Sequence, residues 1–316
     1  MTKGVLVDLT KCIGCNSCVV ACKMYNNNKW IDNRTHFPAA TSGEDAKLAD
    51  ENWTVVRKCR ISAETGERID KRAPLRTDGS EVWRYVKEQC LHCKDPACVS
   101  SCFATAFRQT ELGPVVYYPN LCVGCRYCML ACPFNIPKFE WDNPLPMLTK
   151  CSMCSARVES GDAPACVSVC PTDVMKYGEY DDLLKEAKAI LAGDRQYLQQ
   201  IYSEKEIETL LARGYVQHIY GAEEAGGTLW IYISDKPFET LGFKTNVPKQ
   251  SIPSYTEGFT KKSLVVGVVW FAILSCLYVV TGFISRRAKR QKEQEQAAND
   301  KPEPPAESVA TEPPVT

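Results

Sequence analysis

Three features are scarce or missing in this sequence, and each absence weighs against a class of function. The formal net charge is zero, with 38 basic and 38 acidic residues, so nothing in the charge balance indicates nucleic-acid binding. Histidine occurs only three times, and never in the long apolar stretch near the C-terminus, so the chain offers no obvious haem ligands. No Gly-x-Gly-x-x-Gly follows a predicted strand, so NAD or flavin binding has no support.

The N-terminal segment also lacks the apolar run of a secretory signal peptide, because the chain reaches Cys12 without any long apolar stretch. We therefore expect no cleaved leader. Disulfides dominate small secreted domains, and this chain of 316 residues is neither small nor led by such a signal. Its eighteen cysteines need another explanation.

Sixteen of the eighteen cysteines fall into four groups of four, which we number as motifs one to four. Motifs one and three share the spacing C-x2-C-x2-C-x3-C, which is typical of thiolates that bind [4Fe–4S] clusters. Zinc sites usually join two Cys-x2-Cys pairs across a dozen or more residues, a pattern that only motif four resembles. The motifs are, in order, Cys12, Cys15, Cys18 and Cys22; Cys90, Cys93, Cys98 and Cys102; Cys122, Cys125, Cys128 and Cys132; and Cys151, Cys154, Cys166 and Cys170.

The motifs alternate between two types, which indicates a duplicated unit. The segment 11–22 aligns with 121–132, and 96–102 aligns with 164–170. Gly14 and Gly124 follow the first cysteine of their motifs by two residues, where glycine allows a tight turn that brings N–H groups near sulfur. The fourth cysteine of a two-cluster motif ligates the other motif's cluster. The residues leave open whether motif one pairs with four and two with three, or one with two and three with four.

After Cys170 the chain changes character. Residues 180–213 have helical periodicity broken at Gly193-Asp194, and residues 226–234 predict a strand. Leu264–Ile284 contains no charge, and its 21 residues would span about 30 Å as a helix, enough to cross a bilayer. Five basic residues follow it within 286–292 and two precede it, so the positive-inside rule favours a cytoplasmic C-terminus.

From Cys12 to Cys170 the sequence resembles the four-cluster iron–sulfur subunits of membrane-bound respiratory oxidoreductases, such as formate dehydrogenases, dimethyl sulfoxide and polysulfide reductases, and membrane nickel–iron hydrogenases. The resemblance rests on Cys-Ile-Gly-Cys-Asn-Ser-Cys in motif one, Gln-Cys-Leu-His-Cys-Lys-Asp-Pro-Ala-Cys in motif two, Cys-Pro-Phe at the end of motif three and Lys-Cys-Ser-Met-Cys in motif four. The strand at Gly226 and the single C-terminal apolar helix are most similar in layout to the formate dehydrogenase beta subunit.

The resemblance implies an α+β fold with two pseudo-symmetric bacterial-ferredoxin-like modules, each holding two [4Fe–4S] clusters, plus an insertion, a C-terminal cap and one transmembrane helix. It implies that motif one pairs with four and motif two with three. Carried over residue by residue, the ligand sets are Cys12, Cys15, Cys18 and Cys170 for cluster 1; Cys22, Cys151, Cys154 and Cys166 for cluster 2; Cys90, Cys93, Cys98 and Cys132 for cluster 3; and Cys102, Cys122, Cys125 and Cys128 for cluster 4.

The expected organisation follows from these assignments. Residues 1–36 and 141–180 form one module, 81–140 form the other, 37–80 form a polar insertion and 181–262 form a cap and linker. Residues 263–285 form the transmembrane helix, and 286–316 form a basic and then disordered tail. His92 is expected not to be a ligand, because its motif already has four cysteines. Cys59 and Cys276 stand apart from the motifs and are expected to be free buried thiols.

The function implied is non-catalytic electron transfer between two partners. One is a catalytic molybdopterin, tungstopterin or nickel–iron subunit, and the other is an integral membrane quinone-reactive or cytochrome b subunit. We expect the protein to cross the inner membrane once, with its transmembrane helix in contact with membrane lipid and its clusters on the periplasmic side. There are two alternatives. A stand-alone iron–sulfur enzyme would leave one iron without a cysteine ligand, whereas each of the four motifs here has four cysteines. A membrane scaffold would hold its metal for structure alone.

Overall fold

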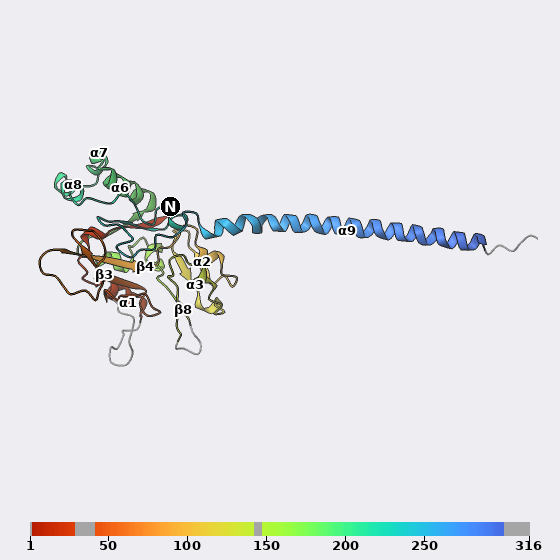
Figure 1. The fold of residues 1–316 in the computed structure, drawn as a ribbon, viewed down its shortest axis with the longest axis horizontal. Coiled ribbons are helices and arrows are strands. Elements are labelled where there is room, and N and C mark those ends of the chain that lie inside the picture. Colours follow the sequence, from red (N-terminus) through yellow and green to blue (C-terminus); the bar gives the residue numbers. More distant parts are fainter. Residues whose placement is uncertain (1, 29–41, 142–146, 300–316) are drawn as a thin grey trace, which may run out of the picture. The chain divides into compact units, whose positions relative to one another are not determined.

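The computed structural model describes residues 2–28, 42–141 and 147–299 and divides into two compact units, Met1–Thr256 and Glu257–Thr316 (Figure 1). All four cysteine motifs lie in the first unit. Helices and short strands are mixed there, as the sequence predicts for an α+β domain.

A three-stranded sheet brings together segments from the beginning, middle and end of the first unit. Its order is β10-β1-β9, with β10 parallel to β1 and β9 antiparallel to it. The strands are β1 (Lys3–Asp8), β9 (Met175–Glu179) and β10 (Trp230–Ile233). Because β9 begins shortly after Cys170 and the turn η1 (Leu9–Lys11) runs from β1 into Cys12, the sheet holds motifs one and four side by side.

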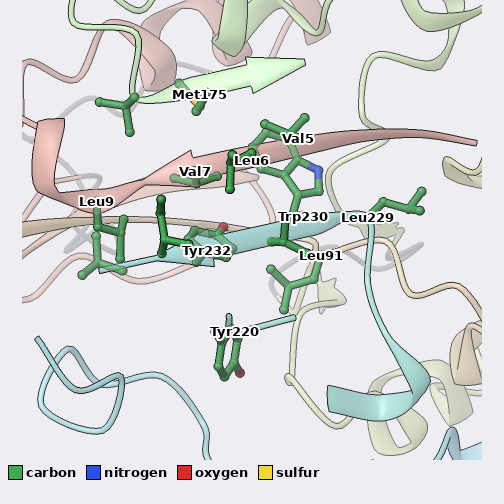
Figure 2. Packing of buried hydrophobic residues seen from close by; sticks show 14 of the residues in the cluster. Val5, Leu6, Val7, Leu9, Leu91, Met175, Tyr220, Leu229, Trp230 and Tyr232 are labelled. Atoms are coloured by element: carbon green, nitrogen blue, oxygen red, sulfur yellow. The ribbon is translucent and has the colours of Figure 1, made fainter. Parts of the chain in front are cut away.

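The core of the first unit lies around this sheet. Figure 2 shows Val5 and Val7 of β1 close to Trp230 and Tyr232 of β10. All four residues of β10 are buried, so the strand is covered on both faces, as a strand inside a domain must be. Part of the segment expected as a cap therefore lies within the central sheet.

A second sheet has the order β2-β3-β4. It is formed by β2 (Ser42–Gly43), β3 (Thr54–Ser62) and β4 (Glu81–Gln89). β3 and β4 each have nine residues, and they pair antiparallel along their whole length. Val56, Cys59 and Ile61 of β3 belong to the main core, so the segment expected as a polar insertion contributes to the interior. Residues 37–41 of that insertion lie outside the described residues.

The cysteine motifs lie in loops and short helices between these strands. Two small hairpins, β5–β6 and β7–β8, complete this region. The elements are α1 (Ser17–Asn26), α2 (Ala97–Ser100), β5 (Phe107–Gln109), β6 (Val115–Tyr117), η2 (Pro119–Leu121), α3 (Tyr127–Ala131), β7 (Lys138–Phe139), β8 (Leu148–Thr149), α4 (Ser155–Glu159) and α5 (Ala165–Ser168).

The helical segment predicted after Cys170 is present and breaks at the expected position, but the part after the break forms two helices where one was expected. The chain forms α6 (Tyr180–Ala192), α7 (Arg195–Leu198) and α8 (Glu204–Leu211), followed by the turn η3 (Glu224–Gly226). Gly193 ends α6 in the left-handed region, with φ of +68°. The Asp194 carboxylate then accepts a hydrogen bond from the backbone N–H of Tyr197 at 3.2 Å, which starts α7.

One helix runs into the second unit. α9 (Ile252–Asn299) has 48 residues and contains the predicted span 263–285. Among the described residues it is the one helix whose length and apolar composition suffice to cross a membrane. It extends beyond the predicted span in both directions. Residues 293–299, expected to be disordered, are helical, and the remainder of the tail, 300–316, lies outside the described residues.

Trp230 offers a direct test of the central core. Replacing its buried ring by alanine leaves a large cavity, so we expect Trp230→Ala to lower the free energy of unfolding by about 3–5 kcal/mol. Trp141→Ala is the matched control, because the Trp141 side chain is 65% exposed and its loss should cost far less. Chemical denaturation of both variants measures the difference, and equal losses would contradict the assignment of the core.

Candidate metal centre

Motifs one and three have the same local backbone. In each, a short 3-10 turn, η1 or η2, ends at the first cysteine. The glycine two residues later has φ of +71° in both motifs. Asn16 and Arg126 then adopt the left-handed conformation and open α1 and α3. The loop between first and third cysteine therefore folds around a centre, and the N–H of Gly124 donates to Cys122 Sγ at 3.4 Å.

Motifs two and four share a second local structure. His92 and Met153, each just before the second cysteine, have positive φ values of 50° and 57°. Pro96 and Pro164 then precede α2 and α5, which carry the third cysteine of each motif. The N–H of Met153 donates to Cys151 Sγ at 3.3 Å. The structure thus repeats the two alternating motif types that the sequence contains.

Packing of the short helices brings distant motifs together. α1 of motif one packs against α5 of motif four. α2 of motif two packs against α3 of motif three (Figure 1). In this way the fourth cysteine of one motif reaches the loop of another. Each pair of helices joins two segments that the sequence alone leaves unpaired.

Thiols of motifs one and four lie together in two groups. Burial is the main cause that raises the pKa of Cys12, and the neighbouring Cys170 and Cys15 raise it further. A cavity lined by Cys12, Cys15, Cys18 and Cys170 lies at this place. Burial likewise raises the pKa of Cys22 to about 12, with contributions from Cys166 and Cys154, and Cys151 has Cys22 and Cys166 as neighbours.

Thiols of motifs two and three form two further groups. Burial raises the pKa of Cys93 well above its usual range, and Cys90, Cys132 and Cys98 add to the effect. Burial also raises the pKa of Cys128 to about 12, and its strongest thiol neighbours are Cys102, Cys122 and Cys125. We name the groups quartets 1 to 4: quartet 1 is 12, 15, 18 and 170; quartet 2 is 22, 151, 154 and 166; quartet 3 is 90, 93, 98 and 132; and quartet 4 is 102, 122, 125 and 128.

Electrostatic influences between thiols of different quartets indicate the order of the quartets. Cys18 of quartet 1 has Cys166 of quartet 2 among the thiols that raise its pKa. Cys151 of quartet 2 has Cys90 of quartet 3 in the same role. Cys98 of quartet 3 has Cys128 of quartet 4. The quartets therefore follow one another in the order 1, 2, 3, 4.

The two outer quartets reach the surface. Cys15 of quartet 1 and Cys125 of quartet 4 are exposed, whereas all four thiols of quartet 2 are buried and no thiol of quartet 3 is exposed. An exposed apolar side chain stands in each of these loops: Ile13 between Cys12 and Cys15 of quartet 1, and Val123 between Cys122 and Cys125 of quartet 4.

Each quartet supplies four cysteine thiols, the donor set of a [4Fe–4S] cluster. Within residues 2–28, 42–141 and 147–299, no three His, Cys, Asp or Glu side chains converge closely enough to hold one metal ion. A cubane binds each of its four thiolates through a different iron, which requires a wider arrangement of sulfurs. Backbone N–H groups of Ala106 and Ile136 also point at Cys102 Sγ and Cys132 Sγ, at 3.2 and 3.5 Å, and such bonds stabilise thiolate charge.

Residues outside the quartets have other roles. His92 is buried, and its Nδ1 accepts a hydrogen bond from the backbone N–H of Val115 at 2.9 Å. Cys59 is buried and donates to the carbonyl of Leu241 at 3.6 Å, as expected for a free thiol. Cys276 is exposed on α9, contrary to the expectation of a buried thiol, because α9 is the one element that residues 257–299 of its unit form.

Sequence reasoning missed three buried cations beside the quartets: Lys23, which directly follows Cys22, and Lys87 and Lys150, which precede motifs two and four. Lys87 precedes motif two by three residues and Lys150 precedes motif four by one residue, and a lysine at such a position is usually assumed to be exposed to solvent. The only available signal was position, because each of these two lysines belongs to a strand or loop that leads directly into a first cysteine.

Similar proteins are known. A family model described as a 4Fe-4S dicluster domain matches residues 81–180. The nitrate-inducible formate dehydrogenase iron-sulfur subunit of Escherichia coli K12 is 31% identical over 284 residues, covering 88% of this chain and 84% of the relative. The hydrogenase-2 operon protein HybA of Escherichia coli O157:H7 is 32% identical over 247 residues, 75% of this chain and 71% of the relative. A protein of Nitratidesulfovibrio vulgaris is 35% identical over 296 residues, covering 93% of this chain and 70% of the relative.

The two equivalent glycines make a matched pair of variants. An alanine at either position would adopt a strained positive φ, at a cost of about 1–2 kcal/mol. At Gly14 the added Cβ would also lie 2.4 Å from ring atoms of Tyr85, whereas at Gly124 it would meet nothing within 4 Å. We expect Gly14→Ala to lower the midpoint of thermal unfolding clearly more than Gly124→Ala, and Tyr85→Ala to remove part of the difference. Identical midpoints for the two glycine variants would contradict this geometry.

Proposed function

The chain belongs to the family of ferredoxin-type iron–sulfur (beta) subunits of respiratory oxidoreductases, and from this premise we propose that it relays electrons through four [4Fe–4S] clusters. Within such a complex it is a non-catalytic electron-transfer subunit. A [4Fe–4S] cluster supplies one-electron redox chemistry when bound. What the chain itself contributes is the number, order, shielding and surface access of the sites.

Quartets 1 to 4 would each hold one cluster, with the ligand sets that the resemblance implies. The neighbour relations of the thiols support this assignment, because each quartet combines three cysteines from one motif with one from its partner motif. The packing of α1 on α5 and of α2 on α3 supports the pairing of motif one with four and of two with three. It also favours two ferredoxin-like modules, residues 1–36 with 141–180 and residues 81–140.

The observation that carries the proposal is the contrast between outer and inner quartets. An electron relay needs sites that partners can approach at its two ends and shielded sites between them. Exposure of Cys15 and Cys125 supplies the ends, and the buried thiols of quartet 2 supply a shielded interior. Catalysis at a cluster would instead need an open iron coordination site, and each quartet here is complete.

The partners follow from family membership. The relatives include an iron-sulfur subunit of formate dehydrogenase and a hydrogenase-2 operon protein. We propose a catalytic molybdopterin, tungstopterin or nickel–iron subunit at one end, and an integral membrane quinone-reactive or cytochrome b subunit at the other. The apolar side chains around the exposed ends suit burial against such partners.

The ligand pairing can be tested with single cysteine variants of the purified complex. Each substitution should perturb one cluster only. The iron content should therefore fall by no more than about four of the about sixteen irons per chain. We expect Cys170→Ser and Cys15→Ser to alter the same electron paramagnetic resonance signal, because both belong to quartet 1. Cys166→Ser lies in the same motif as Cys170 but should alter a different signal, the one that Cys22→Ser alters. If Cys170→Ser and Cys166→Ser changed one common signal, the proposed pairing would be wrong.

We further propose that α9 crosses the inner membrane once, with the C-terminus in the cytoplasm and the clusters on the periplasmic side. Support comes from its apolar composition and from the basic residues between 286 and 292. The hydroxyl of Thr281 donates to the carbonyl of Leu277 at 2.8 Å, so this polar group is satisfied inside the helix, as lipid requires.

Proteolysis of spheroplasts tests the orientation. With the clusters outside, protease added to intact spheroplasts should digest the first unit and leave an epitope tag at the C-terminus protected. Inverted vesicles are the control and should show the reverse pattern. Protection of the first unit in intact spheroplasts would reverse the proposed topology.

A further inference from the structure

Lys87 is a buried cation in β4, with a side chain that is almost completely enclosed, at 1% exposure for the residue. Its ammonium donates to Gln89 Oε1 at 2.7 Å. The Gln89 amide in turn donates to the Tyr232 hydroxyl at 2.6 Å, and that hydroxyl donates to the carbonyl of Lys87 at 3.3 Å. This closed ring of hydrogen bonds holds the ammonium in one position with neutral partners only.

The indole of Trp230 provides a second support. Lys87 Nζ lies 4.5 Å from the centre of this ring, within the range of a cation–π contact. None of the ion pairs formed within the described part of the chain includes Lys87. Its charge is thus enclosed without a paired carboxylate, an arrangement that is costly unless other negative charge is near.

Cysteine thiols of quartets 1 and 2 provide that negative charge once they are ionised. Lys87 lines the same cavity as Cys12, Cys15, Cys18 and Cys170 of quartet 1. Three thiols of quartet 2, those of Cys166, Cys151 and Cys22, are also among its electrostatic neighbours. Burial lowers the pKa of Lys87, but these thiols together with Cys18 raise it above its ordinary value.

The effect on the thiols has the opposite sign. Burial raises the pKa of Cys18 to about 12, and Lys87 is the largest influence that lowers it. Lys87 also lowers the pKa of Cys22, after burial and Cys166 have raised it. An ammonium that lines the cavity of quartet 1 favours negative charge on the sulfurs around it, whereas Lys87 is not among the main causes of the pKa shift of Cys128 in quartet 4.

We propose that Lys87 sets the reduction potentials of the clusters in quartets 1 and 2, by stabilising their reduced forms with a fixed positive charge between them. The inference rests on the proposed function, because it assumes clusters in these quartets. On reduction a cluster with its thiolates gains one electron and one unit of negative charge. Lys87 remains protonated throughout, and no bond to it forms or breaks. Its role is to position charge, and it takes no electron itself.

The test is a redox titration of the purified complex followed by electron paramagnetic resonance, with dithionite as reductant. In Lys87→Met, a neutral side chain of similar length, we expect the ratio of reduced to oxidised cluster at a fixed potential to fall at least tenfold for quartet 1 or 2. For a one-electron couple this is a downward shift of about 59 mV. Clusters in quartets 3 and 4 should titrate as in the unmodified protein. Lys87→Arg should leave the potentials of quartets 1 and 2 close to their unmodified values, because it retains the charge.

Lys185→Met is the matched control. It removes the same charge from an exposed position on α6, where the ammonium pairs with Asp182 at 3.1 Å, and it should leave all four potentials unchanged. If Lys87→Met fails to retain its clusters, Gln89→Glu gives an independent reading. It keeps Lys87 and places a carboxylate where the amide oxygen now lies 2.7 Å from Nζ, so the same clusters should shift downward.

Potentials of quartets 1 and 2 that stay unchanged in cluster-containing Lys87→Met or Gln89→Glu would overturn the inference, and so would an equal shift of all four clusters. A purely structural lysine would lower the unfolding midpoint without moving a potential. Failure of the proposed function would look different, because the unmodified complex would then lack four reducible clusters altogether.

Discussion

Each cysteine quartet has to be closed by a thiol from a distant part of the chain, and this requirement governs the arrangement of the first unit. Cys170 must reach the loop of Cys12 to Cys18, and Cys132 must reach the loop of Cys90 to Cys98. The central sheet meets the first requirement by pairing β1 with β9, directly before and after these motifs. The contact of α2 with α3 meets the second.

The same arrangement couples folding to metal binding. Burial raises the pKa of thiols such as Cys18, Cys22 and Cys98 to about 12, so without iron they would be protonated near neutral pH. Cluster assembly must displace those protons and introduce charge into the interior. Two buried lysines lie where that charge would form. Lys87 lines the cavity of quartet 1 and has thiols of quartet 2 as electrostatic neighbours. Lys150 donates to the carbonyl of Cys151 at 2.9 Å and lowers the pKa of Cys98.

Local spacing made much of the site predictable, because sulfurs three residues apart fold around one centre whatever the rest of the chain does. The duplicated backbone of motifs one and three, and the helix break at Gly193, are local features of this kind. What the residues alone left open was the pairing of motifs, since helix contacts such as α1 with α5 depend on the whole fold. The position of β10 was hidden for the same reason: its four apolar residues predict a strand but not its neighbour β1. Lys87 was missed because charge normally indicates exposure, and only the fold shows that thiols and Trp230 enclose it.

The central claim is that four clusters lie in one ordered series, each held by three cysteines of one motif and one of its partner. Anomalous diffraction at the iron edge from crystals of the purified complex tests it most directly. The account predicts four separate iron centres in this chain, in the order of quartets 1 to 4, with Cys170 at the first and Cys132 at the third. Fewer than four iron centres, or Cys170 bound to the same centre as Cys166, would contradict it.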